Sequence, residues 1–214
     1  MKAISEIRKD YTRAALHEAE VLPHPMRQFE KWFAEVLNAQ VPEPNAMTLA
    51  TVSPQGHPST RVVLLKGIEQ DAFVFFTNYQ SQKGQELALH PGCALNFFWP
   101  ELERQVRVTG VAEKISEAAS EAYFQSRPRA SQLGAWASPQ STAIANRELL
   151  EERLRALEAK FSDQPVLPKP KQWGGFAVRP LRVEFWQGRP SRLHDRINYV
   201  LQPDDTWKWV RLAP

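Results

Sequence analysis

Hydrophobic and polar positions change period along the chain, and each period predicts a type of element. After Pro25, which can take the first position of a helix, apolar residues recur at helical spacing, at Phe29, Trp32, Phe33, Val36 and Leu37. We expect this face to be buried. From residue 47 the period becomes that of strands, with Gly and Pro at the turns, which predicts an antiparallel succession over 47–52, 60–66 and 72–77.

The remaining segments predict an α+β protein. A helix is expected over 81–89, then strands over 93–99 and 104–114, then helices over 116–125, 129–136 and 141–161. A proline-rich connector at 162–171 precedes strands at 176–178, 182–186, 198–201 and 207–212. Short antiparallel strands around a helical insertion favour a barrel, because closure removes exposed edges. We expect one domain over 1–214, with an N-terminal arm at 1–24 and a helical insertion at 116–161.

Composition narrows the class of protein. The 27 Lys and Arg are interleaved with 24 Asp and Glu, so the net charge of +3 is weak evidence for nucleic acid, and we expect none as a partner. Cys93 is the single cysteine, which excludes an internal disulfide and fits a reducing compartment. No apolar run reaches signal-peptide or membrane-span length, so we expect a soluble cytoplasmic protein that does not bind a membrane.

Common catalytic motifs are missing from the sequence. There is no Walker loop, no G-x-G-x-x-G and no G-x-S-x-G, and the five histidines lack the spacing of metal ligands, so no metal is expected. An enzyme without these motifs most simply uses an organic cofactor, because a cofactor carries chemistry that side chains cannot perform.

One candidate anion site surrounds the strand at 61–66. Arg61 and Lys66 stand at its two ends, and as an isolated pair they could equally be solvated strand ends. Nearby, Thr77 ends a strand and Ser81 and Lys83 open a helix. A hydroxyl, a cation and free helix N-terminal amides favour phosphate, so we expect phosphate binding here.

A second candidate anion site combines Tyr123, Arg127 and Ser131 at helix ends. Guanidinium and hydroxyl donors match phosphate geometry, although helix capping and surface charge could explain the same residues. Two anion sites would suit a phosphorylated cofactor beside a phosphorylated substrate.

The segment 186–196 is the densest cluster of candidate functional residues, with Trp186, Arg192, His194 and Arg196. We expect the flanking arginines to lower the pKa of His194 and keep its imidazole neutral near pH 7, although a structural histidine is an alternative. Trp186 could cover a ligand ring or simply belong to the core. Gln105 shares one face of its strand with Arg107, which could be an ordinary polar face, and Ser141 is most simply a helix N-cap.

Ordered motifs along nearly the whole chain resemble those of the pyridoxine (pyridoxamine) 5′-phosphate oxidase family. They are Arg8-Lys9-Asp10-Tyr11, RVVLLK at 61–66, FFTNYQSQKG at 75–84, LERQVRVTG at 102–110, YFQSRPRASQLGAWAS at 123–138, Trp173-Gly174-Gly175-Phe176, EFWQG at 184–188, RLHDR at 192–196 and Arg211-Leu212-Ala213-Pro214. Each motif is weak alone, and the ordered set is highly specific.

The resemblance implies an FMN-binding split β-barrel with a Greek-key-like antiparallel sheet and a smaller helical subdomain, forming a homodimer with FMN at the subunit interface. The positions it assigns to FMN are Arg61, Val62, Val63, Leu64, Leu65, Lys66, Phe76, Thr77, Gln82, Lys83, Gln105, Gln140, Ser141, Trp186 and Arg196. Those it assigns to substrate are Lys66, Tyr123, Arg127, Ser131, Arg192 and His194, the last two also catalytic, with Arg8 and Tyr11 as a lid.

The implied reaction oxidises pyridoxamine or pyridoxine 5′-phosphate to pyridoxal 5′-phosphate, with dioxygen reduced to hydrogen peroxide. His194 could orient the substrate or assist proton removal. Gln82 departs from the common Ser-Arg-Lys pattern and removes one cation, so we expect weaker flavin retention than in a Gln82→Arg variant. The alternatives are another split-barrel flavin oxidoreductase and a non-enzymatic carrier of flavin or pyridoxal phosphate.

Overall fold

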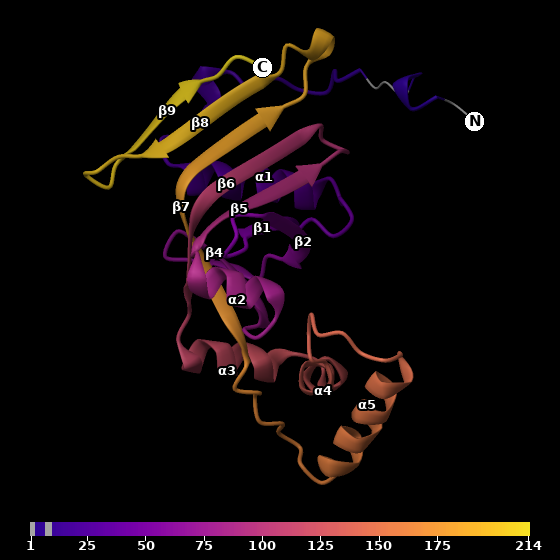
Figure 1. Cartoon of the computed structure of the whole chain (residues 1–214). Coiled ribbons are helices and arrows are strands. Elements are labelled where there is room, and N and C mark those ends of the chain that lie inside the picture. Colours follow the sequence, from indigo (N-terminus) through magenta and orange to yellow (C-terminus); the bar gives the residue numbers. More distant parts are fainter. Residues whose placement is uncertain (1–2, 7–9) are drawn as a thin grey trace. The chain divides into compact units, whose positions relative to one another are not determined.

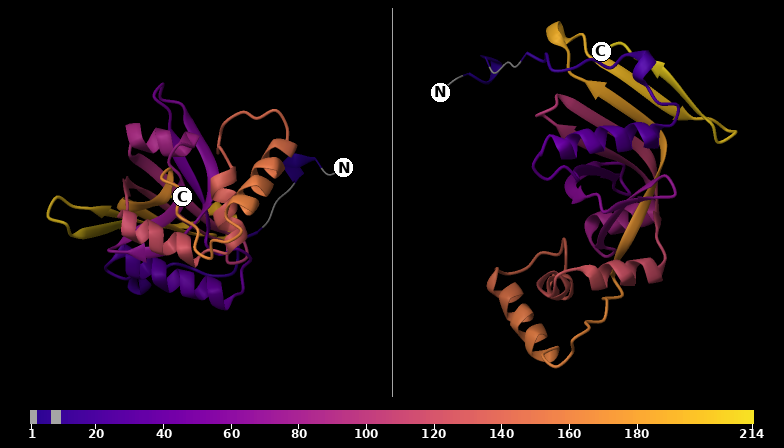
Figure 2. Two further views of the ribbon diagram at one scale, coloured as in Figure 1. Left: turned by 90° about the horizontal axis from the view of Figure 1, so that it is seen from below. Right: turned by 180° about the vertical axis from the view of Figure 1, so that it is seen from behind.

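The structure, a computed structural model, describes residues 3–6 and 10–214 (Figure 1). The chain forms two compact units, each built from separated segments. Unit 1 comprises residues 1–49, 94–110 and 180–214, and unit 2 comprises residues 50–93 and 111–179. The prediction of one domain over 1–214 stays a prediction. Figure 2 gives two further views of the same ribbon.

The described strands follow one hydrogen-bonded order, β2-β1-β5-β6-β7-β4-β3, with β8 pairing with β7 and β9 pairing with β8. Their bounds are β1 (Ala46–Val52), β2 (Pro58–Leu64), β3 (Gly67–Glu69), β4 (Ala72–Asn78), β5 (Gly92–Trp99), β6 (Arg104–Lys114), β7 (Trp173–Gln187), β8 (Asp195–Leu201) and β9 (Trp207–Arg211). Burial alternates along β1, β5 and much of β6, as expected for strands with one face in a core. The β3–β4, β4–β7, β7–β8 and β8–β9 pairs are all antiparallel, as predicted.

Helix α1 (Pro25–Asn38) supplies much of the core of unit 1. His24 accepts a hydrogen bond from the Met26 amide, so the helix begins at Pro25 as predicted. The Phe29 ring lies 5.0 Å from that of Phe97, and Trp32 meets Phe185 edge to face at 5.1 Å. The prediction that Leu37 belongs to the buried face is wrong, since 52% of this residue is exposed. At 3.6 residues per turn it lies about 80° around the helix from Phe29.

Unit 2 combines β4, the first half of β7 and the remaining α-helices. These are α2 (Gln82–Leu89), α3 (Glu117–Ser126), α4 (Arg129–Ala137) and α5 (Glu148–Lys160), the last three being drawn as one group in Figure 1. One cluster of buried hydrophobic residues in unit 2 contains Phe124, Leu133, Phe161, Leu167 and Trp173. The predicted insertion at 116–161 therefore corresponds to α3, α4 and α5.

Several strands differ from the sequence prediction. Strand β7 is continuous, whereas two strands separated at 179–181 were expected. Pro180 lies between residues 173–178, which pair with β4, and residues 182–187, which pair with β8, so its missing N–H interrupts neither ladder. Strand β3 was not predicted, and β8 begins at Asp195 rather than Asn198.

The prediction that Ser141 caps a helix running to residue 161 is wrong. Ser141 has a φ of +70°, in the left-handed region, and α5 begins only at Glu148. The Asn146 side chain accepts a hydrogen bond from the Leu149 amide there and replaces the expected cap. No helix in the described part of the chain is both long and apolar enough to cross a membrane.

Candidate functional site

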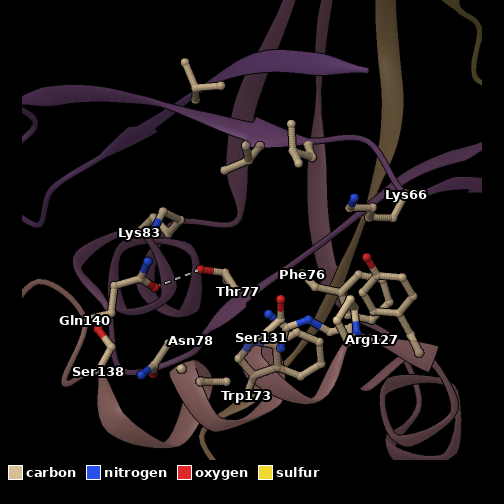
Figure 3. A pocket seen from close by; sticks show the side chains of 17 residues that line it. Lys66, Phe76, Thr77, Asn78, Lys83, Arg127, Ser131, Ser138, Gln140 and Trp173 are labelled. Carbon is tan, nitrogen blue, oxygen red and sulfur yellow. Dashed lines mark hydrogen bonds between the residues drawn. The ribbon is translucent and has the colours of Figure 1, made fainter. Parts of the chain in front are cut away.

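A cavity of about 630 Å³ in unit 2 gathers most of the site residues predicted in the first two-thirds of the chain (Figure 3). Its walls come from β2, β4, α2, α3, α4 and the segments that follow β2 and α4. The predicted residues that line it are Val62, Val63, Leu64, Lys66, Phe76, Thr77, Lys83, Tyr123, Arg127, Ser131 and Gln140. The two anion sites expected from the sequence thus belong to one cavity. In Figure 3, Lys83 and Gln140 lie toward one side and Lys66 and Arg127 toward the other.

Two cations of this cavity, the buried Lys83 and the half-buried Arg127, form no ion pair with a carboxylate among the described residues. Lys83 is 7% exposed, and its ammonium lies 3.4 Å from the Ser81 hydroxyl. Burial lowers the pKa of Lys83, and repulsion from Arg61 adds to this. Arg127 carries a buried Nη1 with no hydrogen-bond partner, and burial lowers its pKa as well. A buried donor without an acceptor is costly, so Arg127 favours an anionic ligand. Lys83 favours one too, because its buried ammonium has only a neutral hydroxyl as acceptor among the described residues.

Helix α2 is held in place by a short cap and a close contact. The Ser81 hydroxyl accepts a hydrogen bond from the Gly84 amide and donates one to the Asn78 carbonyl. A Cβ at residue 84 would lie 2.3 Å from the Tyr79 carbonyl oxygen, so only glycine lets the first turn pack this closely. The contact positions Lys83 at the cavity wall.

Aromatic rings form one wall of the cavity. Phe76 stacks on Tyr123 with ring centres 3.8 Å apart, and on Trp173 at 5.4 Å. The Arg127 guanidinium lies 4.7 Å from the centre of the Trp173 ring, a cation–π contact. The Thr77 hydroxyl donates to the Gln140 side-chain oxygen at 3.3 Å. Flat apolar surface beside cations and polar donors can hold a planar ring with a phosphate.

Four of the unit 2 residues predicted for the cofactor do not line this cavity. The Arg61 guanidinium donates to the Ser59 hydroxyl at 2.7 Å and pairs with Glu86 at 3.4 Å. Gln82 also donates to Glu86, at 2.9 Å. Leu65 is buried, and Ser141 is exposed next to Gln140. The expected effect of Gln82 on flavin retention stays a prediction.

Sequence reasoning missed several lining residues. They are Asn78, Pro128, Gly134, Ala135, Ser138 and Trp173. Each of these residues lies within a motif quoted above, so membership of a motif was the signal that could have identified them.

Unit 1 contains the C-terminal cluster. Trp186 and His194 pack with ring centres 4.7 Å apart, and Tyr11 meets Trp186 edge to face at 5.7 Å and His194 at 5.9 Å. Ser191 and Arg192 have φ of +56° and +63°, a strained backbone for residues with a Cβ. The turn presents Arg192 on the surface. Arg8, the other predicted lid residue, lies outside the described residues.

The electrostatic prediction for His194 holds in direction. Burial lowers the pKa of this imidazole most, the Arg192 guanidinium lowers it further, and Asp195 opposes them. The sequence suggested the arginines as the cause, whereas desolvation is the larger one. The lowered pKa favours the neutral ring near pH 7.

Gln105 and Arg196 line a second cavity, of about 680 Å³, within unit 1. Arg196 pairs with the buried Glu184 at 2.9 Å, and Arg107 pairs with the same carboxylate. Burial raises the pKa of Glu184, but hydrogen bonds from Arg196 and Arg107 outweigh it and leave that pKa below the ordinary value. Gln105 shares its strand face with Arg107, as predicted.

Comparisons with known proteins identify the family of this chain. Residues 33–161 match the family model described as pyridoxamine 5′-phosphate oxidase, and residues 173–214 match the pyridoxine 5′-phosphate oxidase C-terminal dimerisation region. The chain is 58% identical to pyridoxine/pyridoxamine 5′-phosphate oxidase 1 of Ralstonia nicotianae over 214 residues, which cover 100% of both chains.

Two solved structures are similar in fold. PhzG from Burkholderia lata 383, in complex with tetrahydrophenazine-1-carboxylic acid, has a TM-score of 0.87 at 29% identity, covering 94% of this chain and 98% of that one. A pyridoxamine 5′-phosphate oxidase-related, FMN binding protein from Nostoc punctiforme has a TM-score of 0.71 at 19% identity, covering 89% and 98%. These likenesses confirm the predicted split β-barrel class. With matches over both parts of the sequence, the chain belongs to the pyridoxamine 5′-phosphate oxidase family.

Proposed function

We propose that this chain oxidises pyridoxamine 5′-phosphate and pyridoxine 5′-phosphate to pyridoxal 5′-phosphate, with FMN as cofactor and dioxygen as the electron acceptor that becomes hydrogen peroxide. Membership of an oxidase family supports the reaction class, and the 58% identical relative is named for these two substrates. The observation that carries the proposal is the pair of cations in the unit 2 cavity, the buried Lys83 and Arg127 with its buried Nη1, which form no ion pair with a carboxylate among the described residues.

The residues of the cavity fit a flavin and a phosphorylated ring. Lys83, Thr77 and Gln140 would hold the cofactor beside the apolar stretch Val62–Leu64, while Lys66, Tyr123, Arg127 and Ser131 would bind the substrate phosphate. A flavin held there would supply the redox chemistry, as acceptor of the hydride from the substrate carbon and donor of electrons to dioxygen. Arg127 supports this division, because its orphaned Nη1 needs an acceptor that the described chain does not supply.

The residues of unit 1 complete the proposal. Gln105, Trp186 and Arg196 would contact the flavin, and Arg192 and His194 the substrate ring, with Tyr11 as part of a lid. We further propose a homodimer with FMN at the subunit interface, which the match of residues 173–214 to a dimerisation region supports. In this arrangement the residues of the site would orient the substrate carbon toward the flavin, and orientation alone can lower a barrier by roughly 7 kcal/mol.

The test is a spectrum of the purified protein incubated with FMN, desalted, and then given pyridoxine 5′-phosphate without oxygen. Retained flavin absorbance that bleaches supports the cofactor and the half-reaction together. Retained flavin that does not bleach contradicts the substrate assignment, and no retained flavin contradicts the cofactor assignment. Arg192→Ala should lower turnover far more than flavin content, and unchanged turnover would remove Arg192 from the site.

A second candidate is oxidation of a different aromatic substrate, as the likeness to PhzG bound to tetrahydrophenazine-1-carboxylic acid suggests. The presence of Tyr123, Arg127, Ser131 and Arg192 with His194 favours the phosphorylated substrate. If a tetrahydrophenazine carboxylate bleached the flavin and pyridoxine 5′-phosphate did not, the second candidate function would replace the first.

A further inference from the structure

The imidazole of His194 has one of its two ring nitrogens engaged by the backbone. The Arg189 amide donates a hydrogen bond to His194 Nδ1 at 3.1 Å. A neutral imidazole has one N–H and one acceptor nitrogen, and an amide N–H can donate only to the acceptor. Nδ1 is therefore the unprotonated nitrogen, and the ring proton is on Nε2.

The turn that supplies this amide is fixed from several sides. The Arg189 guanidinium donates to the Ala14 carbonyl at 3.2 Å, and it lies 3.6 Å from the Asp195 carboxylate. On the other side of the turn, the Gly188 amide donates to the Glu103 carbonyl at 2.7 Å. The backbone of residue 189 therefore has little freedom to turn its N–H away from His194.

Asp195 connects that turn to two other segments of unit 1. Its Oδ1 accepts a hydrogen bond from Arg211 at 2.7 Å, and its Oδ2 accepts one from the Leu16 amide at 3.0 Å. Arg211 in turn donates to the Leu16 carbonyl at 2.8 Å. One carboxylate thus joins the N-terminal arm, the last strand and the turn that holds His194.

The opposite side of the ring leaves Nε2 available. Tyr11 and Trp186 contact the imidazole through their rings, and within the described residues no group accepts a hydrogen bond from Nε2. The two aromatic contacts fix the plane of the ring while its N–H remains unused.

We propose that His194 acts as a hydrogen-bond donor through Nε2, in a tautomer fixed by the Arg189 amide, and that Asp195 is the positioning residue that maintains it. The inference rests on the proposed function for the identity of the acceptor, an oxygen or nitrogen of the substrate at or beside the carbon that is oxidised. A ring with Nδ1 occupied and Nε2 already protonated orients the substrate and does not remove its proton. Protonation at Nδ1 would break the hydrogen bond that the Arg189 amide donates. The lowered pKa of His194, caused mainly by burial, has the same direction.

The decisive experiment is nitrogen-15 NMR of the histidine side chains near pH 7, with His194 assigned from the spectrum of a His194→Gln variant. We expect the chemical shifts and couplings of the Nε2–H tautomer. An Nδ1–H ring would overturn the proposal whatever the activity. An Nε2–H ring in a protein that does not oxidise pyridoxine 5′-phosphate would support the tautomer and reject the proposed function, so the two failures are distinguishable.

Asp195→Asn tests the positioning role. We expect mixed tautomers at His194 and a fall in kcat/KM of about tenfold, the effect of weakening one charge-assisted bond. The control is Asp204→Asn, since Asp204 bonds only to Thr206 in the following turn among the described contacts. Asp204→Asn should change neither the tautomer of His194 nor kcat/KM. An Asp195→Asn protein with unchanged His194 signals would overturn the role of Asp195.

Two matched variants test the donor itself. The Gln amide nitrogen can overlie Nε2 of histidine, whereas the Asn amide nitrogen overlies Nδ1. We therefore expect His194→Gln to lose about tenfold in kcat/KM and His194→Asn about a hundredfold, the scale of a bond to a developing charge. Equal losses in the two variants would overturn the donor role.

Discussion

Two groups of cations in this protein, one in each unit, are used in opposite ways. In unit 2, Lys83 and Arg127 reach a cavity without a carboxylate partner among the described residues. In unit 1, Arg196 pairs with Glu184, and Arg211 pairs with Glu18 and Asp195. The first arrangement leaves positive charge for a ligand, while the second uses charge to hold strands and the N-terminal arm together. A dense cluster of arginines therefore does not by itself indicate a binding site.

The largest expected effect comes from removing an unpaired cation. Arg127→Ala should raise KM for the phosphorylated substrate about a hundredfold, because a hydrogen bond to a charged group contributes about 1.5–3 kcal/mol. The free energy of unfolding should change by less than about 1 kcal/mol, since the orphaned Nη1 is a cost in the empty protein. Steady-state kinetics and urea unfolding measure the two quantities.

Arg129→Ala is the matched control, two residues away on the same motif. Its guanidinium donates to the Phe161 carbonyl at 2.6 Å and the Gln164 carbonyl at 2.9 Å. We expect a loss of stability of about 1 kcal/mol with KM unchanged. A rise in KM for both variants would contradict the distinction between free and structural arginines.

Gly84→Ala should give the next largest effect. The new Cβ would overlap the Tyr79 carbonyl, so α2 must move, and we expect a loss of about 2 kcal/mol, typical of overpacking. The shift would also displace Lys83 and weaken flavin retention. Gly92→Ala, where nothing lies within 4 Å of the added carbon, is the control and should change neither. Thermal unfolding and equilibrium dialysis with FMN compare the pair.

Glu184→Gln tests the paired cations of unit 1 and should cost about 1 kcal/mol, less than a fully buried pair because Arg107 is half exposed. The pH dependence has a definite sign. The pKa of Glu184 lies below its ordinary value of 4.5 in the folded chain, so its contribution is present above that pH and lost as pH falls below it. Urea unfolding at several pH values should show the difference between native and variant shrinking in acid. A constant difference would contradict the linkage.

Ser191→Gly should have the smallest effect. Residue 191 has a φ of +56°, and glycine removes the left-handed penalty of about 1 kcal/mol while adding some unfolded-state entropy. We expect a net gain of roughly 0.5 kcal/mol in the free energy of unfolding. Ser191→Ala keeps the Cβ and should show no gain. If the two variants were equally stable, the strain assigned to this turn would be absent.

Local pattern was sufficient for most of the fold. The helix at Pro25 and the strands of alternating burial follow from residues close in sequence, and the structure confirms them. It was insufficient at Pro180, where a proline usually ends a strand. Continuity of β7 depends on a change of partner from β4 to β8, which no local pattern contains. The prediction that Ser141 caps a helix was also wrong because local pattern was insufficient. Its left-handed backbone belongs to a loop whose path is set by packing.

The candidate site shows the same contrast between what local sequence predicts and what tertiary structure decides. The sequence alone predicted which residues could carry chemistry, since cations, hydroxyls and aromatics occur in ordered motifs. Most of those predicted in the first two-thirds of the chain line one cavity. Only the tertiary structure decided which cations are neutralised. Arg61 meets Glu86, 25 residues away, and Arg196 meets Glu184 on a neighbouring strand, while Arg127 meets no carboxylate in the described chain. Whether an arginine and a carboxylate form an ion pair depends on distances of a few ångströms between segments remote in sequence. The burial of the two groups then sets the strength of their attraction. The tautomer of His194 was decided in the same way, by a backbone amide that only a folded turn brings to the ring.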